Sequence, residues 1–400
     1  MKRKFNITVL LGVFVALFTA CTETNNGMSA GMESESQPVV KFVRYTDLEL
    51  GDQLISSAPM GKTVVIVGEG LEGVTKVFFN DLDAKINPTM ITPTAIVAKI
   101  PALMPNEVTN TITLTTHKGK STVFDFAVEI PSPAVNSITC EWAPVGSTAT
   151  IYGSSFFARA DGTIDVSFPG NVAAKVKSFT NTEIVFEVPV GASKGNIVVE
   201  NDYGKGRSIF TYKDNTGIFI DGENPAAWNN WGLSAGFVSD GGLDGNYVLL
   251  KGATGEWAWP GNPIQLYYVR NDGTSIVSEG EVSEYALRME VNCKSWKGTP
   301  MLVWFDDPGE AHAVDGTAAQ YHWKPYLTAP DKNYVTDGWI TVTMPLSEFI
   351  YSKDESDESR KISSMSNVKN LNIMFFGPAG TDNTDFALEM MLDNIRLVKL

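Results

Sequence analysis

The chain of 400 residues carries 31 basic and 46 acidic residues, so its formal net charge is −15 at pH 7. Such an acidic chain is a poor partner for nucleic acid and for anionic membrane surfaces, and it favours a neutral or cationic ligand. The length allows two or three domains of roughly 150 residues each.

The first 20 residues have the pattern of a secretory signal. Three cations (Lys2–Lys4) precede an apolar run (Val9–Leu17), which is far shorter than the ~20 residues needed to span a bilayer. Cys21 after "LFTA" resembles the acylated cysteine of the bacterial lipobox, with Phe18 where that pattern usually has Leu. We therefore predict a lipoprotein signal peptide over residues 1–20 and lipidation of Cys21. Because residues 1–20 carry three positive and no negative charges, their removal moves the formal charge from −15 to −18.

Residues 21–37, "CTETNNGMSAGMESESQ", are polar and poor in β-branched and aromatic residues. This composition predicts a flexible tether between the lipid and the first folded domain.

Two segments, residues 38–131 and 132–213, repeat one pattern. The first contains "KTVVIVGEGLEGVTKVFFNDLDA", "TPTAIVAKIP" and "TNTITLTTHKGKSTVFDFAV". The second contains "STATIYGSSFFARADGTIDVSFPGNVAA", "TNTEIVFEVP" and "KGNIVVENDYGKGRSIFTYK". Short alternating strands rich in Val, Ile, Thr and Phe, separated by Gly, Asn and Pro, predict two antiparallel β-sandwiches.

These two segments resemble the immunoglobulin-like modules called IPT or TIG domains. The matching positions of the first copy are Gly68, Gly70, Val77, Phe79, Ile96, Pro101, Gly119 and Phe126. Those of the second are Gly153, Phe156, Val166, Phe168, Ile184, Pro189, Gly204 and Phe210. Such positions serve packing and turns, so the resemblance implies a fold rather than an activity, and we interpret both modules as spacers.

Residues 214–400 differ in composition, because eight of the nine Trp of the chain fall between Trp228 and Trp339. Segments such as "NYVLLKG", "TPMLVWFDD", "GWITVTMPLSEF" and "VKNLNIMFFG" are strand-like, and no long helix is credible. This pattern predicts one jelly-roll sandwich. The closing "DNIRLVKL" is similar to the last strand of jelly-roll carbohydrate-binding modules. The predicted fold class is therefore all-β, with two immunoglobulin-like sandwiches followed by a jelly roll.

The segment "ALRMEVNCKSW" is the most readable strand of this region. Its alternation places one set of side chains in the core, namely Leu287, Met289, Val291 and Cys293. The other set is polar and ends in an indole: Arg288, Glu290, Asn292, Lys294 and Trp296. That second face is either a solvated outer face or, as in jelly-roll binding modules, a concave face whose Arg288, Glu290 and Asn292 bond sugar hydroxyls.

Aromatic side chains supply the other candidates for a sugar site, since sugar rings stack their C–H faces on flat aromatics. The candidates lie beside Gly, Pro, Asn or Lys, which are residue types of loops and edges. They are Trp228, Trp231, Trp257, Trp259, Trp296, Tyr321, Trp323 and Tyr326. Trp304 and Trp339 sit inside better strands, and we assign them to packing.

Catalysis has little support in the sequence. Glycosidases need two carboxylates facing each other across a cleft, and the sequence does not place two at working separation. The chain has three His and lacks H-E-x-x-H, G-x-S-x-G and a paired CxxC. We expect no catalytic residues, and the charged run "KDESDESRK" from Lys353 is most simply a solvated loop.

We also expect no cofactor. Asp221 and Asp393, near the two ends of the jelly roll, could share a structural Ca²⁺ as in similar modules, although acidic turn residues are common without metal. Cys140 and Cys293 fall in different predicted domains, so we expect two buried free thiols.

A lipidated Cys, a tether, two immunoglobulin-like modules and a Trp-rich jelly roll together resemble the surface glycan-binding lipoproteins (SGBP-B-like) of Bacteroidetes polysaccharide utilisation loci. The resemblance implies a non-catalytic protein on the outer membrane, facing the cell exterior, that holds a neutral polysaccharide beside a SusC/SusD-like import complex and surface glycosidases. β-Glucans or xyloglucan are the expected ligands. A surface glycoside hydrolase with a carboxylate pair and a protein-binding adhesin remain alternative hypotheses.

Overall fold

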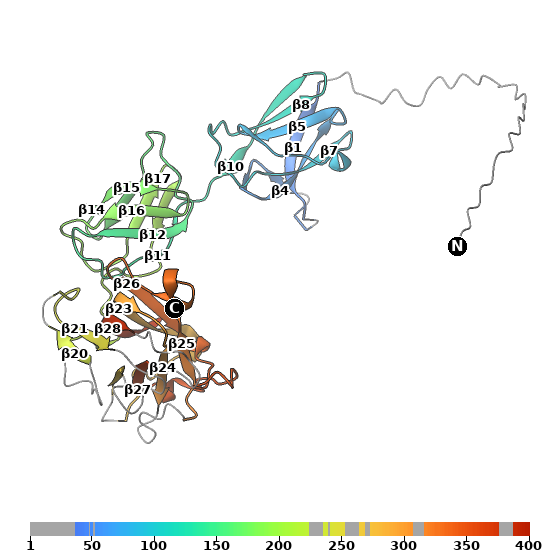
Figure 1. The fold of residues 1–400 in the computed structure, drawn as a ribbon. Coiled ribbons are helices and arrows are strands. Elements are labelled where there is room, and N and C mark those ends of the chain that lie inside the picture. Colours follow the sequence, from blue (N-terminus) through green and yellow to red (C-terminus); the bar gives the residue numbers. More distant parts are fainter. Residues whose placement is uncertain are drawn as a thin grey trace, which may run out of the picture. The chain divides into compact units, whose positions relative to one another are not determined.

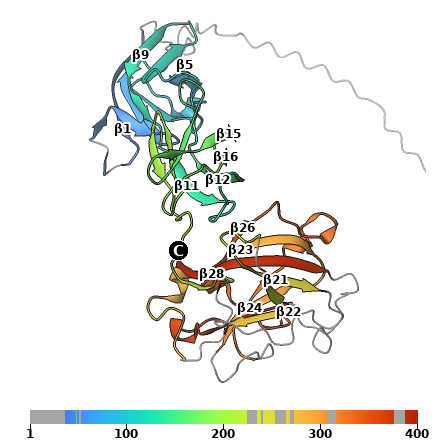
Figure 2. The ribbon, with the colours of Figure 1, turned by 90° about the vertical axis from the view of Figure 1, so that its left-hand side faces the viewer.

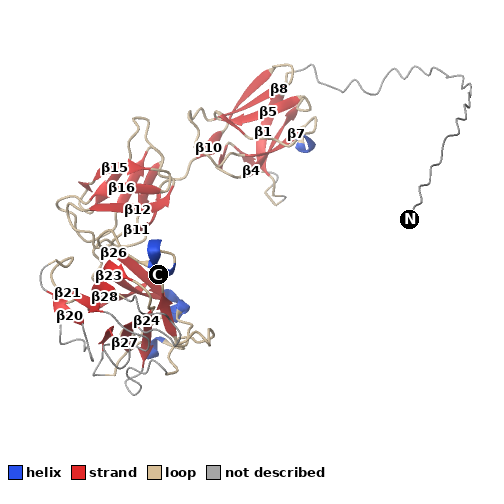
Figure 3. Cartoon of the chain, viewed as in Figure 1, coloured by secondary structure: helices blue, strands red, loops and turns tan. Residues whose placement is uncertain are grey.

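The computed structural model describes residues 37–47, 49–50, 53–223, 235–238, 241–252, 264–268, 273–306, 316–375 and 387–400. Their regular structure consists of strands and short 3₁₀ helices (Figure 3), which confirms the prediction of an all-β chain. Within these residues, no helix has the length and apolar character needed to cross a membrane. The chain divides into two compact units, residues 1–130 and 131–400 (Figure 1).

The first unit holds an immunoglobulin-like sandwich with one sheet in the order β2-β1-β4-β7 and another in the order β6-β5-β8-β9. A parallel pair, β3 and β10, adds to it. The elements are β1 (Val39–Tyr45), β2 (Leu54–Ile55), β3 (Ser57–Pro59), β4 (Thr63–Glu69), β5 (Val74–Phe79), β6 (Leu82–Asp83), η1 (Pro88–Met90), β7 (Ala95–Lys99), β8 (Thr111–Thr116), β9 (Ser121–Asp125) and β10 (Ala127–Glu129).

The second immunoglobulin-like domain, at the start of the second unit, has a related topology, in which the fourth strand of one sheet lies at the opposite edge. Its sheets have the orders β11-β12-β16-β15 and β14-β13-β17-β18. The strands are β11 (Ala134–Ile138), β12 (Thr148–Ser154), β13 (Asp165–Phe168), β14 (Val172–Ala173), β15 (Lys175–Phe179), β16 (Glu183–Glu187), β17 (Val198–Asn201) and β18 (Gly204–Arg207). The apolar positions expected to serve packing are buried in both copies, among them Phe79 and Phe126 in the first and Phe168 and Ile184 in the second.

Gly68 and Gly153 occupy equivalent positions in the two copies, opposite Val40 in the pair β1–β4 and opposite Val135 in the pair β11–β12, where the register shifts. A Cβ atom on Gly68 would lie 1.9 Å from the Val39 carbonyl oxygen, and one on Gly153 would lie 1.9 Å from that of Ala134. Only glycine permits this approach. The repeated glycine is therefore a packing requirement of the fold.

The C-terminal jelly roll follows in the same unit. Its strands are β19 (Ile218–Ile220), β20 (Ala235–Val238), β21 (Tyr247–Gly252), β22 (Ile264–Tyr268), β23 (Tyr285–Trp296), β24 (Met301–Asp306), β25 (Gln320–Trp323), β26 (Ile340–Pro345), β27 (Asn370–Phe375) and β28 (Leu388–Lys399). Its 3₁₀ helices are η3 (Val282–Glu284), η4 (Pro325–Leu327), η5 (Pro330–Lys332), η6 (Leu346–Glu348) and η7 (Met365–Asn367).

Two antiparallel sheets form the layers of the jelly roll (Figure 2). The β28 sheet has the order β20-β21-β28-β23-β26, with β19 also paired to β28, and the β27 sheet has the order β22-β27-β24-β25. Alternate residues of both sheets, such as Val291 of β23 and Ile373 of β27, meet in one hydrophobic core between them. Each sheet therefore has a second, outer face, and these two outer faces decide where a ligand could bind.

Candidate functional site

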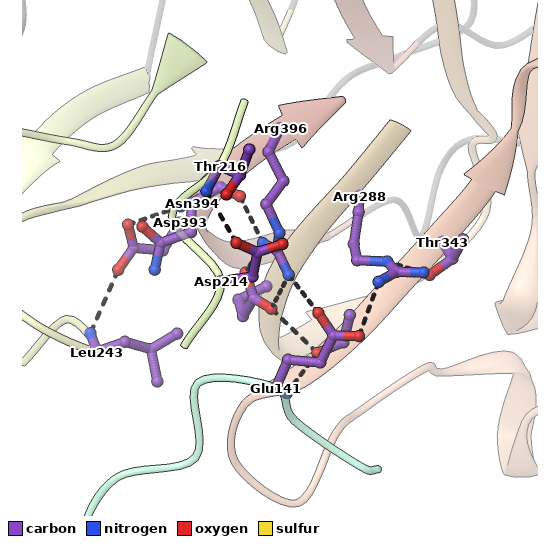
Figure 4. A network of polar contacts seen from close by, with 11 residues as sticks. Glu141, Asp214, Thr216, Leu243, Arg288, Thr343, Asp393, Asn394 and Arg396 are labelled. Carbon is purple, nitrogen blue, oxygen red and sulfur yellow. Dashed lines mark hydrogen bonds and ion pairs between the residues drawn. The ribbon is translucent and has the colours of Figure 1, made fainter. Parts of the chain in front are cut away.

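Three charged side chains on the outer face of the β28 sheet, Arg288, Glu290 and Arg396, form a network with Glu141 (Figure 4). Arg396 contacts Glu290 through Nη1 at 2.5 Å and Nη2 at 3.0 Å, and its Nη2 also contacts Glu141 at 2.8 Å. Glu141 accepts from Arg288 Nη1 at 2.8 Å as well. Glu141 belongs to the second immunoglobulin-like domain, so the network joins that domain to the jelly roll.

Main-chain and apolar contacts extend this junction. The Glu141 backbone N–H donates to Thr341 Oγ1 at 2.7 Å, and the Thr341 N–H donates to the Thr139 carbonyl at 2.8 Å. Leu243 and Trp339 of the jelly roll pack against the hydrophobic core of the immunoglobulin-like domain. This domain is thus built onto the outer face of the β28 sheet, which is more than the spacer role we expected.

The prediction that Arg288, Glu290 and Asn292 contact sugar is therefore not supported by their positions. Arg288 binds Glu141 and Thr343, whereas Glu290 is fully buried against Arg396. Asn292 is buried on the same face. The alternation of the strand was interpreted correctly, but this outer face is occupied by a neighbouring domain of the same chain.

Trp296 was expected on that outer face and lies in the core instead. Cys293 pairs with Met390 and Ser295 pairs with Glu389, so Lys294 is an extra residue that forms a β-bulge. The bulge reverses the alternation, and Trp296 joins Cys293 on the core side. Its Nε1 donates to the Thr299 carbonyl at 2.7 Å, so this indole is a satisfied core residue.

The aromatics of "QYHWKPY" also face the core. Tyr321 packs on Phe349 at a ring distance of 5.6 Å, and Trp323 packs edge-on against Trp296 at 5.1 Å. Tyr326 is buried against Trp296, and burial raises its pKa to about 12. Tyr321 and Trp323 are partly exposed, but their rings pack against Phe349 and Trp296.

The remaining aromatic candidates lie outside the described residues. These are Trp228, Trp231, Trp257 and Trp259, in the segments 224–234 and 253–263. Their assignment to the glycan site stays a prediction.

The outer face of the β27 sheet is the candidate binding face, because none of the contacts among the described residues joins it to another domain, although its central side chains are buried. Its central strands carry Leu302, Trp304 and Met374, which form a cluster separate from the main core. The Cα partners of Trp304 are Asn372 of β27 and Gln320 of β25, so an indole and two side-chain amides share this face. Trp304 is packed as expected, although on this face and not between the sheets.

Strand β25 and the following loop add charged groups to the edge of this candidate binding face. His322 lies beyond Gln320 on the same face, and its Nδ1 contacts Glu355 Oε1 at 2.7 Å. Lys324 also donates to Glu355 Oε1. Tyr321 and Trp323, which we predicted as surface residues, lie on the opposite face of β25 and pack against the core.

Burial shifts the pKa values of these groups in different directions. Desolvation lowers the pKa of His322 from its ordinary 6.5, so the imidazole is neutral at pH 7 and Nδ1–H donates to Glu355. The pKa of Glu355 is lowered by its hydrogen bonds from Lys324 and His322, against the opposing effect of burial. A neutral ring and an ionised carboxylate therefore meet at the edge of the face.

Acidic residues elsewhere in the jelly roll are used in other ways. Glu290 is paired with Arg396, and Asp393 accepts N–H groups from Leu243 and Asn394. Burial raises the pKa of Asp393 to about 7. Among the described residues, no group of three or more His, Cys, Asp or Glu is arranged to hold a metal ion, so a Ca²⁺ at Asp221 and Asp393 stays a prediction.

Cys140 and Cys293 are both buried free thiols, as expected. Burial raises the pKa of the Cys293 thiol to about 12 and that of Cys140 further. Neither thiol is reactive at neutral pH.

Comparisons with known proteins agree with this architecture. Residues 212–399 match the family model of the surface glycan-binding protein B xyloglucan binding domain, and residues 133–217 match the IPT/TIG domain. A curated IPT/TIG domain-containing protein of Bacteroides ovatus is 25% identical over 185 residues, which are 44% of this chain and 36% of that protein. The chain thus matches little more than a third of the length of this relative.

Two solved structures are similar over nearly the whole chain. Surface glycan-binding protein PbSGBP-B from Prevotella bryantii has a TM-score of 0.74 and 24% identity, with 91% of this chain and 99% of that chain covered. SGBP-B from a complex xyloglucan utilization locus in Bacteroides uniformis has a TM-score of 0.49 and 18% identity, with 91% and 100% covered. The predicted resemblance is confirmed: the chain is similar to the surface glycan-binding proteins B, and its residues 133–217 and 212–399 match the models of the IPT/TIG domain and of the xyloglucan binding domain.

Proposed function

We propose that the protein is a non-catalytic polysaccharide-binding lipoprotein of the cell surface that captures a neutral glycan, with β-glucan or xyloglucan as the favoured ligand. The observation that carries this proposal is the match of residues 212–399 to the surface glycan-binding protein B xyloglucan binding domain. The net charge of −15 fits a neutral ligand better than an acidic one.

The outer face of the β27 sheet is the proposed binding face. The outer face of the β28 sheet is covered by the second immunoglobulin-like domain, through Glu141, Arg288 and Arg396. On the β27 sheet Trp304, Gln320 and Asn372 are themselves buried, so the groups that sugar hydroxyls can reach are the partly exposed Lys324 and Glu355 at its edge. Trp257 and Trp259, which precede β22 of this sheet in the sequence, are the proposed stacking residues.

A binding role without catalysis is supported by how the buried carboxylates are used. A glycosidase needs one carboxyl group with a raised pKa and a second carboxylate across a cleft from it. Glu290 and Asp393 are the described buried carboxyl groups with raised pKa values, and both face the junction with the immunoglobulin-like domain. They lie on the opposite side of the jelly roll from the proposed binding face.

Attachment to the outer membrane through lipidated Cys21 is part of the proposal, as are its partners. The lipobox-like sequence and the tether over residues 21–37 support an anchored protein. A binding protein of this kind would retain polysaccharide beside a SusC/SusD-like import complex and surface glycosidases.

The test is a polysaccharide panel in affinity gel electrophoresis, with xyloglucan, mixed-linkage β-glucan and an α-glucan control. We expect retardation by at least one of the β-linked glycans and no release of reducing sugar. Trp257→Ala or Trp259→Ala should abolish retardation while the thermal midpoint stays near that of the unmodified protein. Release of reducing sugar would indicate a hydrolase, and retention of a protein partner with no glycan bound would indicate an adhesin.

A further inference from the structure

The segment after β26 adds one rung to the β27 sheet. Tyr351 and Gln320 exchange two backbone hydrogen bonds, with N···O distances of 2.9 and 3.0 Å. Opposed residues of an antiparallel pair point to the same face. Tyr351 therefore lies on the outer face of the sheet, and its ring stacks on His322 at 5.0 Å with an interplanar angle of 28°.

Residues 350–360 form a closed loop beside this rung. The Arg360 N–H donates to the Ile350 carbonyl at 3.1 Å, which joins the two ends of the loop. The Arg360 guanidinium also bonds the carbonyls of Gly316 and Ala318, and the Ser352 N–H donates to the Asp357 carbonyl. The acidic run that we expected to be a solvated loop is thus pinned to β25 by its own polar groups.

The backbone of this loop is shaped to present Glu355. Glu355 adopts φ = 60°, a left-handed conformation that is costly for a residue other than Gly or Asn. In that conformation its carboxylate receives His322 Nδ1–H and the Lys324 ammonium. A strained residue at this position suggests a role for its side chain that outweighs the strain.

His322 is buried, whereas the side chains around it are partly exposed and can be reached by a ligand. The His322 side chain is 1% exposed, whereas those of Lys324 and Glu355 are 30% and 34% exposed. Tyr351 is partly exposed as well. We propose that Tyr351, Glu355 and Lys324 form a glycan-contacting rim along the β25 edge of the binding face. His322 is the positioning residue of this rim, because it holds both the Tyr351 ring and the Glu355 carboxylate.

The chemistry of the rim indicates the class of ligand. A carboxylate accepts hydrogen bonds from adjacent hydroxyl groups, an ammonium donates to hydroxyl and ring oxygens, and an aromatic ring contacts C–H groups. The rim carries one negative and one positive charge, so it attracts neither anionic nor cationic polymers. It fits a neutral glycan with free neighbouring hydroxyls, and this inference rests on the proposed function.

The experiment compares three rim variants of the full mature chain by isothermal titration calorimetry against xyloglucan and mixed-linkage β-glucan. Glu355→Gln, Lys324→Ala and Tyr351→Ala should each weaken the affinity about three- to tenfold. The matched control is Glu389→Gln, whose carboxylate pairs with Lys251 at 2.7 Å on the β28 sheet with a similar side-chain exposure of 37%. This control should leave the affinity unchanged.

Two His322 variants test the positioning role separately. His322→Ala should lose affinity to the same extent as Glu355→Gln, whereas His322→Gln keeps an N–H donor for Glu355 and should recover most of it. Glu355 and Asp354 of the loop and Lys324 of its own segment are the charged groups that face His322. As the pH falls below 6.5 and His322 takes up a proton, the affinity of the unmodified protein should fall, and that of His322→Gln should stay constant.

The outcomes distinguish the two proposals. If the unmodified protein binds neither glycan, both the proposed function and the proposed rim are contradicted. If the unmodified protein binds and the three rim variants bind as tightly as Glu389→Gln, only the proposed contact between the rim and the glycan is contradicted. Lys324→Ala separates an effect on binding from an effect on folding, since a partly exposed lysine can be truncated without harm to the fold.

Discussion

The two outer faces of the jelly roll are polar for different reasons. That of the β28 sheet carries alternating charges, with Arg396 and Glu290 fully buried under the second immunoglobulin-like domain. That of the β27 sheet carries buried amides, an indole and an imidazole, with the partly exposed Glu355 and Lys324 at its edge. Buried paired charges suit a permanent contact within the chain, whereas partly exposed groups at an edge suit a ligand that binds and leaves.

Removal of the Arg396 side chain should have the largest effect on the covered face of the β28 sheet. Arg396→Ala leaves Glu290 and Glu141 as buried carboxylates without their main partner, so we expect the free energy of unfolding to fall by about 4 kcal/mol. Chemical denaturation of the mature chain measures this loss. The exposed Arg207→Ala is the control and should change stability by less than about 0.5 kcal/mol. An equally small effect of Arg396→Ala would mean that the charge network does not join the two domains.

Asp393, on the same side of the jelly roll, predicts that the stability of the protein depends on pH. The pKa of Asp393 is raised from 3.8 to about 7, so the folded state holds a proton that the unfolded state has already released. Stability should therefore decrease as the pH rises from about 4 to about 7, by about 3 kcal/mol in total. The charged groups near Asp393 are Asp244 and Glu290, which both oppose its ionisation.

Asp393→Asn tests this dependence, since the amide keeps one acceptor oxygen and does not ionise. The variant should show a flatter stability profile between about pH 4 and about pH 7 in denaturation curves recorded at each pH. The exposed Asp125→Asn serves as the control. A profile of Asp393→Asn that stays parallel to that of the unmodified protein would contradict the raised pKa.

Local sequence patterns predicted much of the fold. Alternation identified Leu287, Met289 and Val291 as core residues, and the repeated Gly68 and Gly153 were assigned to packing and turns, where the structure shows a close backbone approach. These features depend on neighbours in the sequence and on steric limits that a single residue type satisfies. Such information is local and can be read without the structure.

The site was less predictable, because its features depend on long-range contacts and on irregular geometry. The bulge at Lys294 turned Trp296 from the surface into the core, and no composition signal marks a bulge at that residue. Arg288 is covered by the second immunoglobulin-like domain through Glu141, which is 147 residues away in the sequence. Either face of β25 fits the alternation of "QYHW", and only the structure shows that Tyr321 and Trp323 pack against the core.

A variant of Trp296 tests whether this aromatic residue belongs to the core or to the binding site. Trp296→Phe removes the N–H that bonds the Thr299 carbonyl and leaves that buried acceptor unpaired, so we expect a loss of about 1–2 kcal/mol of stability. Glycan affinity, measured by titration calorimetry at a temperature where the variant is folded, should stay unchanged. A large loss of affinity with unchanged stability would place Trp296 in the binding site after all.

The smallest expected effect concerns the loop at residues 350–360, whose pH dependence should run opposite to that of the β28 face. The pKa of His322 lies below 6.5 in the folded protein, so acid favours the state in which this loop is released and the ring can take up a proton. Stability from this contact is complete above pH 6.5 and is lost as the pH falls below it.

Hydrogen exchange, corrected for its intrinsic pH dependence, should therefore show faster exchange of the Tyr351 and Gln320 amides in acid than at neutral pH. The Val199 amide of the immunoglobulin-like domain should show no such change. Acid would then loosen the ligand-facing edge of the jelly roll while protonation of Asp393 stabilises the junction on the other face. Equal protection of Tyr351 at both pH values would instead mean that the loop is held by Arg360 and Ser352 alone.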